Sequence, residues 1–210
     1  MTSKTHIPEN DLAVFETLYL LAEGFYQPTP ELSENLRALP EVLQSMDPET
    51  KGSARRMLSE LENQSQKELL KEYSRLFLGP FQLEAPPFGS VYLEDEVRIM
   101  GESTAEAQRM YRESGLDISP DFNSPPDHVA AELEFLAYLG FQEKNSQEAS
   151  QETFFREQRA LFLHRHIGRW FPLFAENVEK NSDMGFYLEL IQLTRQLLKL
   201  ETENFESVLH

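Results

Sequence analysis

The sequence predicts an all-α protein, a single helical bundle domain over 1–210 in which an N-terminal and a C-terminal half are joined by a hinge. Apolar residues recur at helical spacing along most of the chain, and several of these stretches follow a signal that begins a helix. No stretch alternates between apolar and polar residues as a half-buried strand does. Two irregular segments divide the chain, so we place the halves at about 1–115 and 125–210 and the hinge at about 116–124.

The first three predicted helices each follow a recognisable start. Asn10 precedes the first helix as an N-cap. Thr29-Pro30 and Asp47-Pro48 then repeat one device, a capping side chain followed by proline at the first helical position. The residues expected to face inward are Leu12, Phe15, Leu18, Ala22 and Phe25 in the first helix, and Met57, Leu58 and Leu61 in the third.

A capping box begins the next helix. In this motif the side chains of Ser65 and Glu68 each accept a hydrogen bond from the backbone N–H of the other residue. Gly79-Pro80 is expected to end the helix, because glycine favours a left-handed end and proline cannot continue the ladder. The apolar face between them consists of Leu69, Tyr73, Leu76 and Phe77.

An ordered loop is expected at 81–100, where prolines and a glycine interrupt any helical period. We expect a short extended piece around Val91 and Tyr92. The loop carries many large apolar side chains for such a connection, among them Phe81 and Phe88. Either the loop folds back and buries them, or part of this surface lines a groove that anchors a peptide. The pattern alone leaves both possibilities open.

Helical signals resume after this loop. Ser103 and Glu106 form a second capping box, and Gly115 is expected to end that helix. Residues 116–124, rich in Asp, Ser and Pro, follow as the predicted hinge.

The C-terminal half is predicted to contain three helices. Asp127 lies in the first turn of the first helix, where the helix dipole favours a carboxylate. After the start of the second helix, Trp170, Phe171 and Phe174 are expected to continue an apolar surface that Gly168 and Pro172 interrupt. The first helix is expected to open with Ser124-Pro125-Pro126-Asp127 and to end at about Glu143. A loop at 144–151, a helix that starts at about Phe154 and a last helix at about 182–203 follow.

The chain is strongly acidic, with 36 acidic and 19 basic residues and a formal net charge of −17. This charge argues against nucleic acid and anionic membranes as partners and favours a cationic partner. No apolar stretch is long enough for membrane insertion. The chain has no cysteine, which excludes disulfides, thiolate metal sites and a cysteine nucleophile. Because the N-terminus has no secretory signal, we expect a soluble, cytoplasmic protein.

Asp127, His128 and Glu132 are the strongest candidates for metal ligands, because His128 and Glu132 are four residues apart on one helical face. A complete site needs more ligands, and His164 and His166 would point in different directions on a helix. No nucleophile elbow and no glycine-rich phosphate loop is present. The sequence therefore predicts no catalytic residue, no metal and no cofactor. A helical metal-dependent hydrolase is the alternative from a different class.

Three segments in order carry a family resemblance. Residues 72–80 read Glu-Tyr-Ser-Arg-Leu-Phe-Leu-Gly-Pro, 86–92 read Pro-Pro-Phe-Gly-Ser-Val-Tyr, and 126–128 read Pro-Asp-His. Together they resemble the signatures of the TorD/DmsD/NarJ family of redox-enzyme maturation chaperones, with agreement in order and spacing over about 72–170. Further matching residues are Glu132, Leu133 and Phe135 in the second signature, and Phe162, His166 and Trp170 in a weaker third region.

The resemblance implies a cytoplasmic chaperone rather than an enzyme. Its partner would be the immature catalytic subunit of a molybdenum-cofactor oxidoreductase, bound through a twin-arginine signal peptide in many members and held until the cofactor is inserted. The residues expected in the signal-peptide site, with the groove formed around the first signature, are Tyr73, Arg75, Leu76, Phe77, Gly79, Pro80, Pro86, Pro87, Phe88, Ser90, Tyr92, Asp127, His128 and Glu132.

Alternatives remain within this class. A NarJ-like assembly chaperone would bind internal sites of a molybdoenzyme subunit that is never exported. The resemblance also allows a monomer or a domain-swapped dimer, and a bound GTP, although no motif in the sequence locates a nucleotide site.

Overall fold

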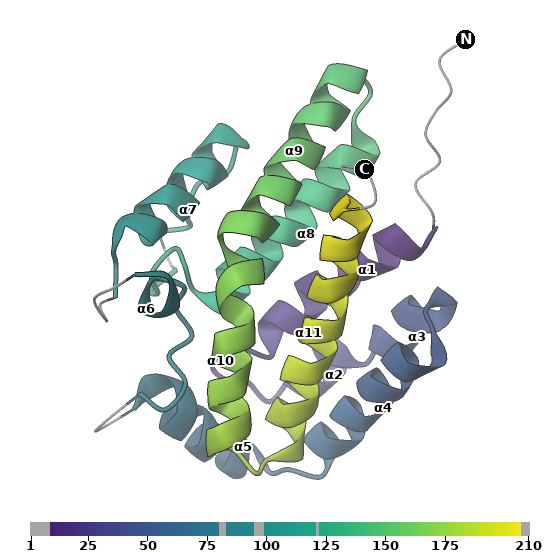
Figure 1. Ribbon diagram of the computed structural model, residues 1–210. Coiled ribbons are helices and arrows are strands. Elements are labelled where there is room, and N and C mark those ends of the chain that lie inside the picture. Colours follow the sequence, from purple (N-terminus) through teal and green to yellow (C-terminus); the bar gives the residue numbers. More distant parts are fainter. Residues whose placement is uncertain (1–8, 80–82, 95–98, 121, 207–210) are drawn as a thin grey trace.

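The computed structural model describes residues 9–79, 83–94, 99–120 and 122–206 (Figure 1). Within these residues the regular structure is helical, and the strand-type pairing is limited to one isolated antiparallel bridge between Phe88 and His128. The elements are α1 (Glu9–Glu23), α2 (Leu32–Leu36), α3 (Leu39–Val42), the 3₁₀ helix η1 (Leu43–Ser45), α4 (Pro48–Glu62), α5 (Gln66–Tyr73), the π-helix η2 (Ser74–Leu78), α6 (Ser90–Leu93), α7 (Glu102–Glu113), α8 (Val129–Asn145), α9 (Ala149–Arg165), α10 (Ile167–Asn181) and α11 (Gly185–Glu206).

Four long helices, α8 to α11, form the centre of the bundle (Figure 1). Helix α1 packs along α8, and α4 packs along α11. The short helix α6 packs on α10, and α7 packs on α6 and α9. None of the helices in the described ranges has both the length and the apolar character that crossing a membrane requires.

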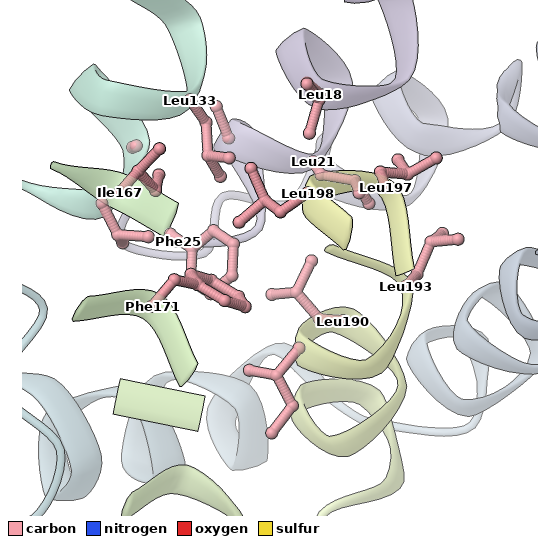
Figure 2. Packing of buried hydrophobic residues seen from close by; sticks show 14 of the residues in the cluster. Leu18, Leu21, Phe25, Leu133, Ile167, Phe171, Leu190, Leu193, Leu197 and Leu198 are labelled. Atoms are coloured by element: carbon pink, nitrogen blue, oxygen red, sulfur yellow. The ribbon is translucent and has the colours of Figure 1, made fainter. Parts of the chain in front are cut away.

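Apolar side chains from α1, α8, α10 and α11 meet in one core (Figure 2). Burial of each such side chain contributes about 1.5–3 kcal/mol to folding. The members labelled in Figure 2 are Leu18, Leu21, Phe25, Leu133, Ile167, Phe171, Leu190, Leu193, Leu197 and Leu198, all at most 5% exposed.

Two of the predicted helix starts are confirmed. The Asp47 carboxylate accepts hydrogen bonds from the backbone N–H groups of Glu49 and Thr50, at 2.9 and 3.1 Å. Ser65 and Glu68 form the reciprocal capping box at the start of α5. Both motifs involve residues only two or three positions apart, which explains why the sequence alone reveals them.

Other predicted starts are wrong. Asn10 lies inside α1 rather than before it. Helix α2 begins at Leu32, after a turn in which the Leu32 N–H donates to the Thr29 carbonyl, so Pro30 does not occupy the first helical position. Leu12, predicted to face inward, is 38% exposed.

The capping box predicted at Ser103 and Glu106 is also wrong. Helix α7 begins at Glu102, and its N-cap, Gly101, has no side chain that could cap it. The Ser103 N–H and hydroxyl donate to the Glu94 carboxylate instead, at 3.0 and 2.7 Å. A partner from the preceding segment thus replaces the local motif.

The predicted interruption at Gly168 and Pro172 is displaced. The chain breaks at His166, between α9 and α10, and Pro172 lies inside α10. An interior proline costs a helix about 3 kcal/mol, and α10 offsets this cost by burying Trp170, Phe171 and Phe174 completely. The loop predicted at 144–151 is shortened to 146–148.

Elements of both predicted halves share the core, since α1 packs on α8 and α4 packs on α11. The hinge at about 116–124 stays a prediction.

The contact between α1 and α8 gives a first testable prediction. A Cβ atom on Gly140 would lie 2.5 Å from the buried ring of Phe15. Gly140→Ala is therefore expected to lower the free energy of unfolding by about 1–3 kcal/mol in urea titrations followed by circular dichroism. Gly52→Ala is the matched control on α4, where the nearest atom is the flexible end of Arg56 at 3.3 Å. This control should raise the stability by up to about 1 kcal/mol, and equal effects of the two changes would contradict the close approach.

Candidate functional site

The signature segment 86–92 lies against the segment that contains Pro126, Asp127 and His128. The Gly89 N–H donates to the Asp127 carbonyl, and the Val129 N–H donates to the Pro87 carbonyl, both at 2.9 Å. The Ser90 N–H donates to the Asp127 carboxylate at 2.7 Å. These three bonds fix residues 87–90 on residues 127–129. We call this arrangement the signature clasp.

The clasp corrects two predictions. Val91 and Tyr92 are not extended but belong to the short helix α6. Asp127 does not lie in the first turn of α8. It precedes that helix, and its carboxylate accepts the hydrogen bond from Ser90 at the start of α6. The physical argument for a carboxylate at a helix N-terminus holds, but the helix that benefits is α6.

His128 is the N-cap of α8, and its Nδ1 accepts a hydrogen bond from the Ala130 N–H at 3.2 Å. Its ring is 3% exposed and lies parallel to the ring of Tyr26, with the centroids 5.8 Å apart. Burial lowers the pKa of His128 to about 4, so the imidazole is neutral near pH 7. Sequence reasoning missed Tyr26, which no motif marks.

Glu132 lies beneath the clasp and is completely buried. Its Oε2 accepts a hydrogen bond from the indole N–H of Trp170 at 2.8 Å. Burial raises the pKa of Glu132 well above its ordinary value, and the bond from Trp170 offsets only part of this effect. A Cβ atom on Gly89 would come within 2.9 Å of the same indole nitrogen, so glycine lets the loop approach this pair.

His166 completes the buried polar centre. Its Nδ1 lies 3.8 Å from Glu132 Oε1, and its Nε2 lies 3.7 Å from Glu106 Oε2. Burial lowers the pKa of His166 to about 4. The break between α9 and α10 occurs at this residue, which places the third signature region against the second.

Three expected groove residues are part of the core. Tyr73, Leu76 and Phe77 are 6%, 0% and 2% exposed, and the Phe77 ring contacts those of Phe174 and Tyr187. They therefore do not line an accessible groove in this conformation. The apolar face of α5 and η2 turns inward because α10 and α11 offer it an apolar partner.

Arg75 is exposed and joins the first signature to the turn between α10 and α11. Its guanidinium pairs with Glu72 at 2.7 Å and donates to the Asn181 carbonyl. The Ser182 hydroxyl donates to the same Glu72 carboxylate at 2.6 Å. Gly79 ends η2 with a φ of 45°, a left-handed conformation that glycine adopts without strain.

Part of the first signature remains accessible. Leu78 is 57% exposed, and Pro86, Phe88 and Tyr92 are half-buried. The Tyr92 ring stacks on Trp170 at 5.7 Å, and Phe88 contacts His128 at 5.6 Å. Pro87 and Ser90 are buried in the clasp, and Pro80 lies outside the described residues. We define the signature surface as Arg75, Leu78, Pro86, Phe88 and Tyr92.

The geometry does not support a metal site built on Asp127, His128 and Glu132. Each side chain is directed to a different partner: Ser90, Ala130 and Trp170 respectively. Across the part of the chain that the structure describes, no group of three His, Asp or Glu side chains is arranged to hold a metal ion.

Comparison with known proteins identifies the family. The family model described as nitrate reductase delta subunit matches residues 28–176. The chain is 28% identical over 141 residues to the chaperone protein TorD of Vibrio parahaemolyticus, covering 67% of this chain and 65% of TorD. It is 32% identical over 134 residues to the Tat proofreading chaperone DmsD of Salmonella typhi, covering 64% of this chain and 60% of DmsD. The chain therefore belongs to the TorD/DmsD/NarJ family, as its motifs predicted.

These matches span less than two thirds of the length of the two relatives. A solved structure from Archaeoglobus fulgidus, described as a redox enzyme maturation protein, aligns with a TM-score of 0.59. The alignment covers 95% of this chain and 98% of that one at 20% identity. At this identity the likeness concerns the fold, and it confirms the predicted all-helical architecture.

The buried carboxyl of Glu132 gives a second testable prediction. Its folded-state pKa is raised, so the folded protein keeps a proton that the unfolded chain releases above about pH 4.5. Its contribution to stability therefore falls as the pH rises. Glu132→Gln removes this proton and keeps an oxygen that can accept from Trp170. The unfolding free energy of the variant minus that of wild type should increase from about pH 5 to about pH 7, by up to about 1.4 kcal/mol per pH unit.

Urea titrations at each pH measure this difference. Glu16→Gln, which changes an exposed carboxylate on α1, is the matched control. A difference for Glu132→Gln that does not vary with pH would contradict a neutral carboxyl in the folded protein.

Proposed function

We propose that this chain is a cytoplasmic chaperone that binds an immature molybdenum-cofactor oxidoreductase subunit, most directly through its twin-arginine signal peptide, until the cofactor is inserted. The observation that carries the proposal is the family membership together with the signature clasp. The clasp brings the separate signatures together and leaves the signature surface accessible beside it. The TorD and DmsD relatives are named as chaperones, and DmsD as a Tat proofreading chaperone.

The chemistry of the signature surface suits such a peptide. A twin-arginine signal has a basic beginning and an apolar middle. Leu78, Phe88 and Tyr92 offer apolar and aromatic area, and aromatic side chains are strong anchors in peptide recognition. The net charge of −17 favours approach of the basic part.

Buried signature residues have a different role in this proposal. Asp127 holds the clasp, His128 caps α8 and Glu132 binds Trp170 beneath the clasp, while Tyr73, Leu76 and Phe77 hold the first signature in the core. They position the accessible side chains, and they contact the peptide only if the clasp opens. No chemical step is required, because a chaperone that binds the immature client more tightly than the mature one stabilises it by mass action.

A NarJ-like role is the second candidate, and the description of the matching family model as nitrate reductase delta subunit favours it. In that case the client is not exported, and the chain binds its mature regions. Overlapping peptides of the recovered client separate the two, since binding confined to the signal supports the first proposal and binding confined to mature regions supports the second.

The accessible leucine gives a third testable prediction. Leu76 and Phe77 are buried, so their substitution would report on folding, whereas Leu78→Ser changes an exposed side chain. We expect Leu78→Ser to lower the amount of client that co-purifies with the tagged chain from host cells by about tenfold, as loss of an apolar anchor does. Mass spectrometry of the co-purified proteins measures the change and identifies the client.

Leu173→Ser is the matched control, because Leu173 is 46% exposed on α10 and lies outside the signature surface. The control should recover as much client as wild type. Equal recovery by both variants would refute the claim that the signature surface binds the client. A wild-type chain that recovers no oxidoreductase subunit would refute the proposed chaperone function.

A further inference from the structure

A hollow of about 330 Å³ lies between α1, α8 and the segment that follows α7. Its walls are mainly aromatic and aliphatic, and it is separate from the signature surface. A volume of this size is near the lower end for ligand pockets, about 300–1,000 Å³, which suits a large side chain rather than an extended cofactor. Its apolar walls include Tyr19, Tyr111, Leu116, Ile118, Phe122 and Phe135.

Hydrogen bonds hold the walls in place. The hydroxyl of Tyr138 donates to the Ser114 carbonyl at 2.9 Å, and that of Tyr111 donates to the Pro126 carbonyl at 2.8 Å. The two bonds anchor both ends of the segment that forms one wall. The Tyr111 ring also packs edge-on against Phe135, with the centroids 4.5 Å apart. The hollow is therefore formed before any ligand arrives.

The rim is acidic. Asp117 and Glu134 line the hollow, and none of its described lining residues is basic; the exposed Arg112, outside the lining, lies 3.7 Å from the Asp117 carboxylate. Tyr26 donates to Glu134 at 2.9 Å, and burial raises the pKa of this carboxyl. A cation close to it would favour the charged form. The hollow thus combines an apolar interior with an edge that attracts positive charge.

The hollow also touches the second signature. Phe122, one of its walls, contacts the rings of Tyr26 and His128, both with centroids 6.2 Å apart. Phe88 of the signature surface contacts the same His128 ring. His128 thus lies between the two sites. A polypeptide that occupied both would gain affinity through effective concentration.

We propose that this hollow is a second docking site, which takes a large apolar side chain whose neighbour in the same polypeptide segment is lysine or arginine. Resting on the proposed function, the segment belongs to the client that the signature surface binds. The apolar side chain enters between Leu116, Ile118 and Phe135, and the basic neighbour meets Asp117 and Glu134. Complementary charge is what distinguishes this occupant from a neutral peptide.

Disulfide tethering tests the site without knowledge of the client, because the chain has no cysteine of its own. Ser119, which lines the hollow, is changed to cysteine in the full chain (Ser119→Cys). The protein is equilibrated with the tetrapeptides Cys-Gly-Leu-Arg, Cys-Gly-Ser-Arg and Cys-Gly-Leu-Glu, each supplied as its mixed disulfide with mercaptoethanol, in the presence of free mercaptoethanol. The protein thiolate attacks the peptide sulfur and releases mercaptoethanol, and the free thiol keeps the exchange reversible. Mass spectrometry measures the tethered fraction. Ser59→Cys, at an exposed serine on α4, is the matched control.

We expect Ser119→Cys to favour the Leu-Arg peptide over the Ser-Arg peptide by about tenfold, as burial of one leucine side chain implies. Ser59→Cys should show no preference. Ala131→Leu, which fills the hollow from α8, should abolish the preference, and so should Tyr19→Ser, which removes a half-exposed wall. Glu134→Gln should reduce the preference for Leu-Arg over Leu-Glu.

Equal tethering of the leucine and serine peptides, or a preference that survives both Ala131→Leu and Tyr19→Ser, would overturn the docking site. Equal tethering of the Leu-Arg and Leu-Glu peptides would show that a basic neighbour does not contribute to binding, and this would overturn the proposed occupant. Neither result bears on recovery of the client through Leu78, so failure of this inference and failure of the proposed function are distinguishable.

Discussion

The signature clasp is the interaction on which the rest of the site depends. Three hydrogen bonds from Gly89, Ser90 and Val129 join two segments that are almost forty residues apart in sequence. They fix residues 87–90 of the loop after η2, whose earlier part is held by the bond from the Ala85 N–H to the Leu76 carbonyl. With them, Phe88 and Tyr92 reach the surface over a rigid base, and α6 begins at a carboxylate. A binding surface held on rigid elements avoids part of the entropy that a mobile loop loses on binding.

Burial explains why polar signature residues belong to the base of this surface and not to its outer face. Glu132 bonds to Trp170, and His128 and His166 are neutral near pH 7 because burial lowers the pKa of each to about 4. A client that docks on the signature surface meets aromatic and aliphatic side chains and Arg75. Recognition of basic segments then comes from the overall negative charge and, in our proposal, from the acidic rim of the hollow between α1 and α8.

The sequence predicted what depends on neighbours in the chain. The cap at Asp47 and the box at Ser65 follow from residues within three positions, and the family motifs located the segments of the clasp. It could not predict features set by distant partners. Ser103 bonds to Glu94 rather than to its local partner, and Asp127 caps α6 rather than α8. Apolar spacing predicted that Leu76 lies on the apolar face of its helix. Only the packing of this face against α10 and α11 shows that it belongs to the protein core and does not line a groove.

Hydrogen-exchange mass spectrometry of the complex recovered from host cells, compared with the free chain, tests the central claim most directly. Backbone amides report where the client covers or rigidifies the chain. The account predicts slower exchange in 72–79 and 83–93, where the signature surface lies, and unchanged exchange in 48–62, which is α4. Slower exchange confined to α4 and α11, with the signature segments unaffected, would contradict it.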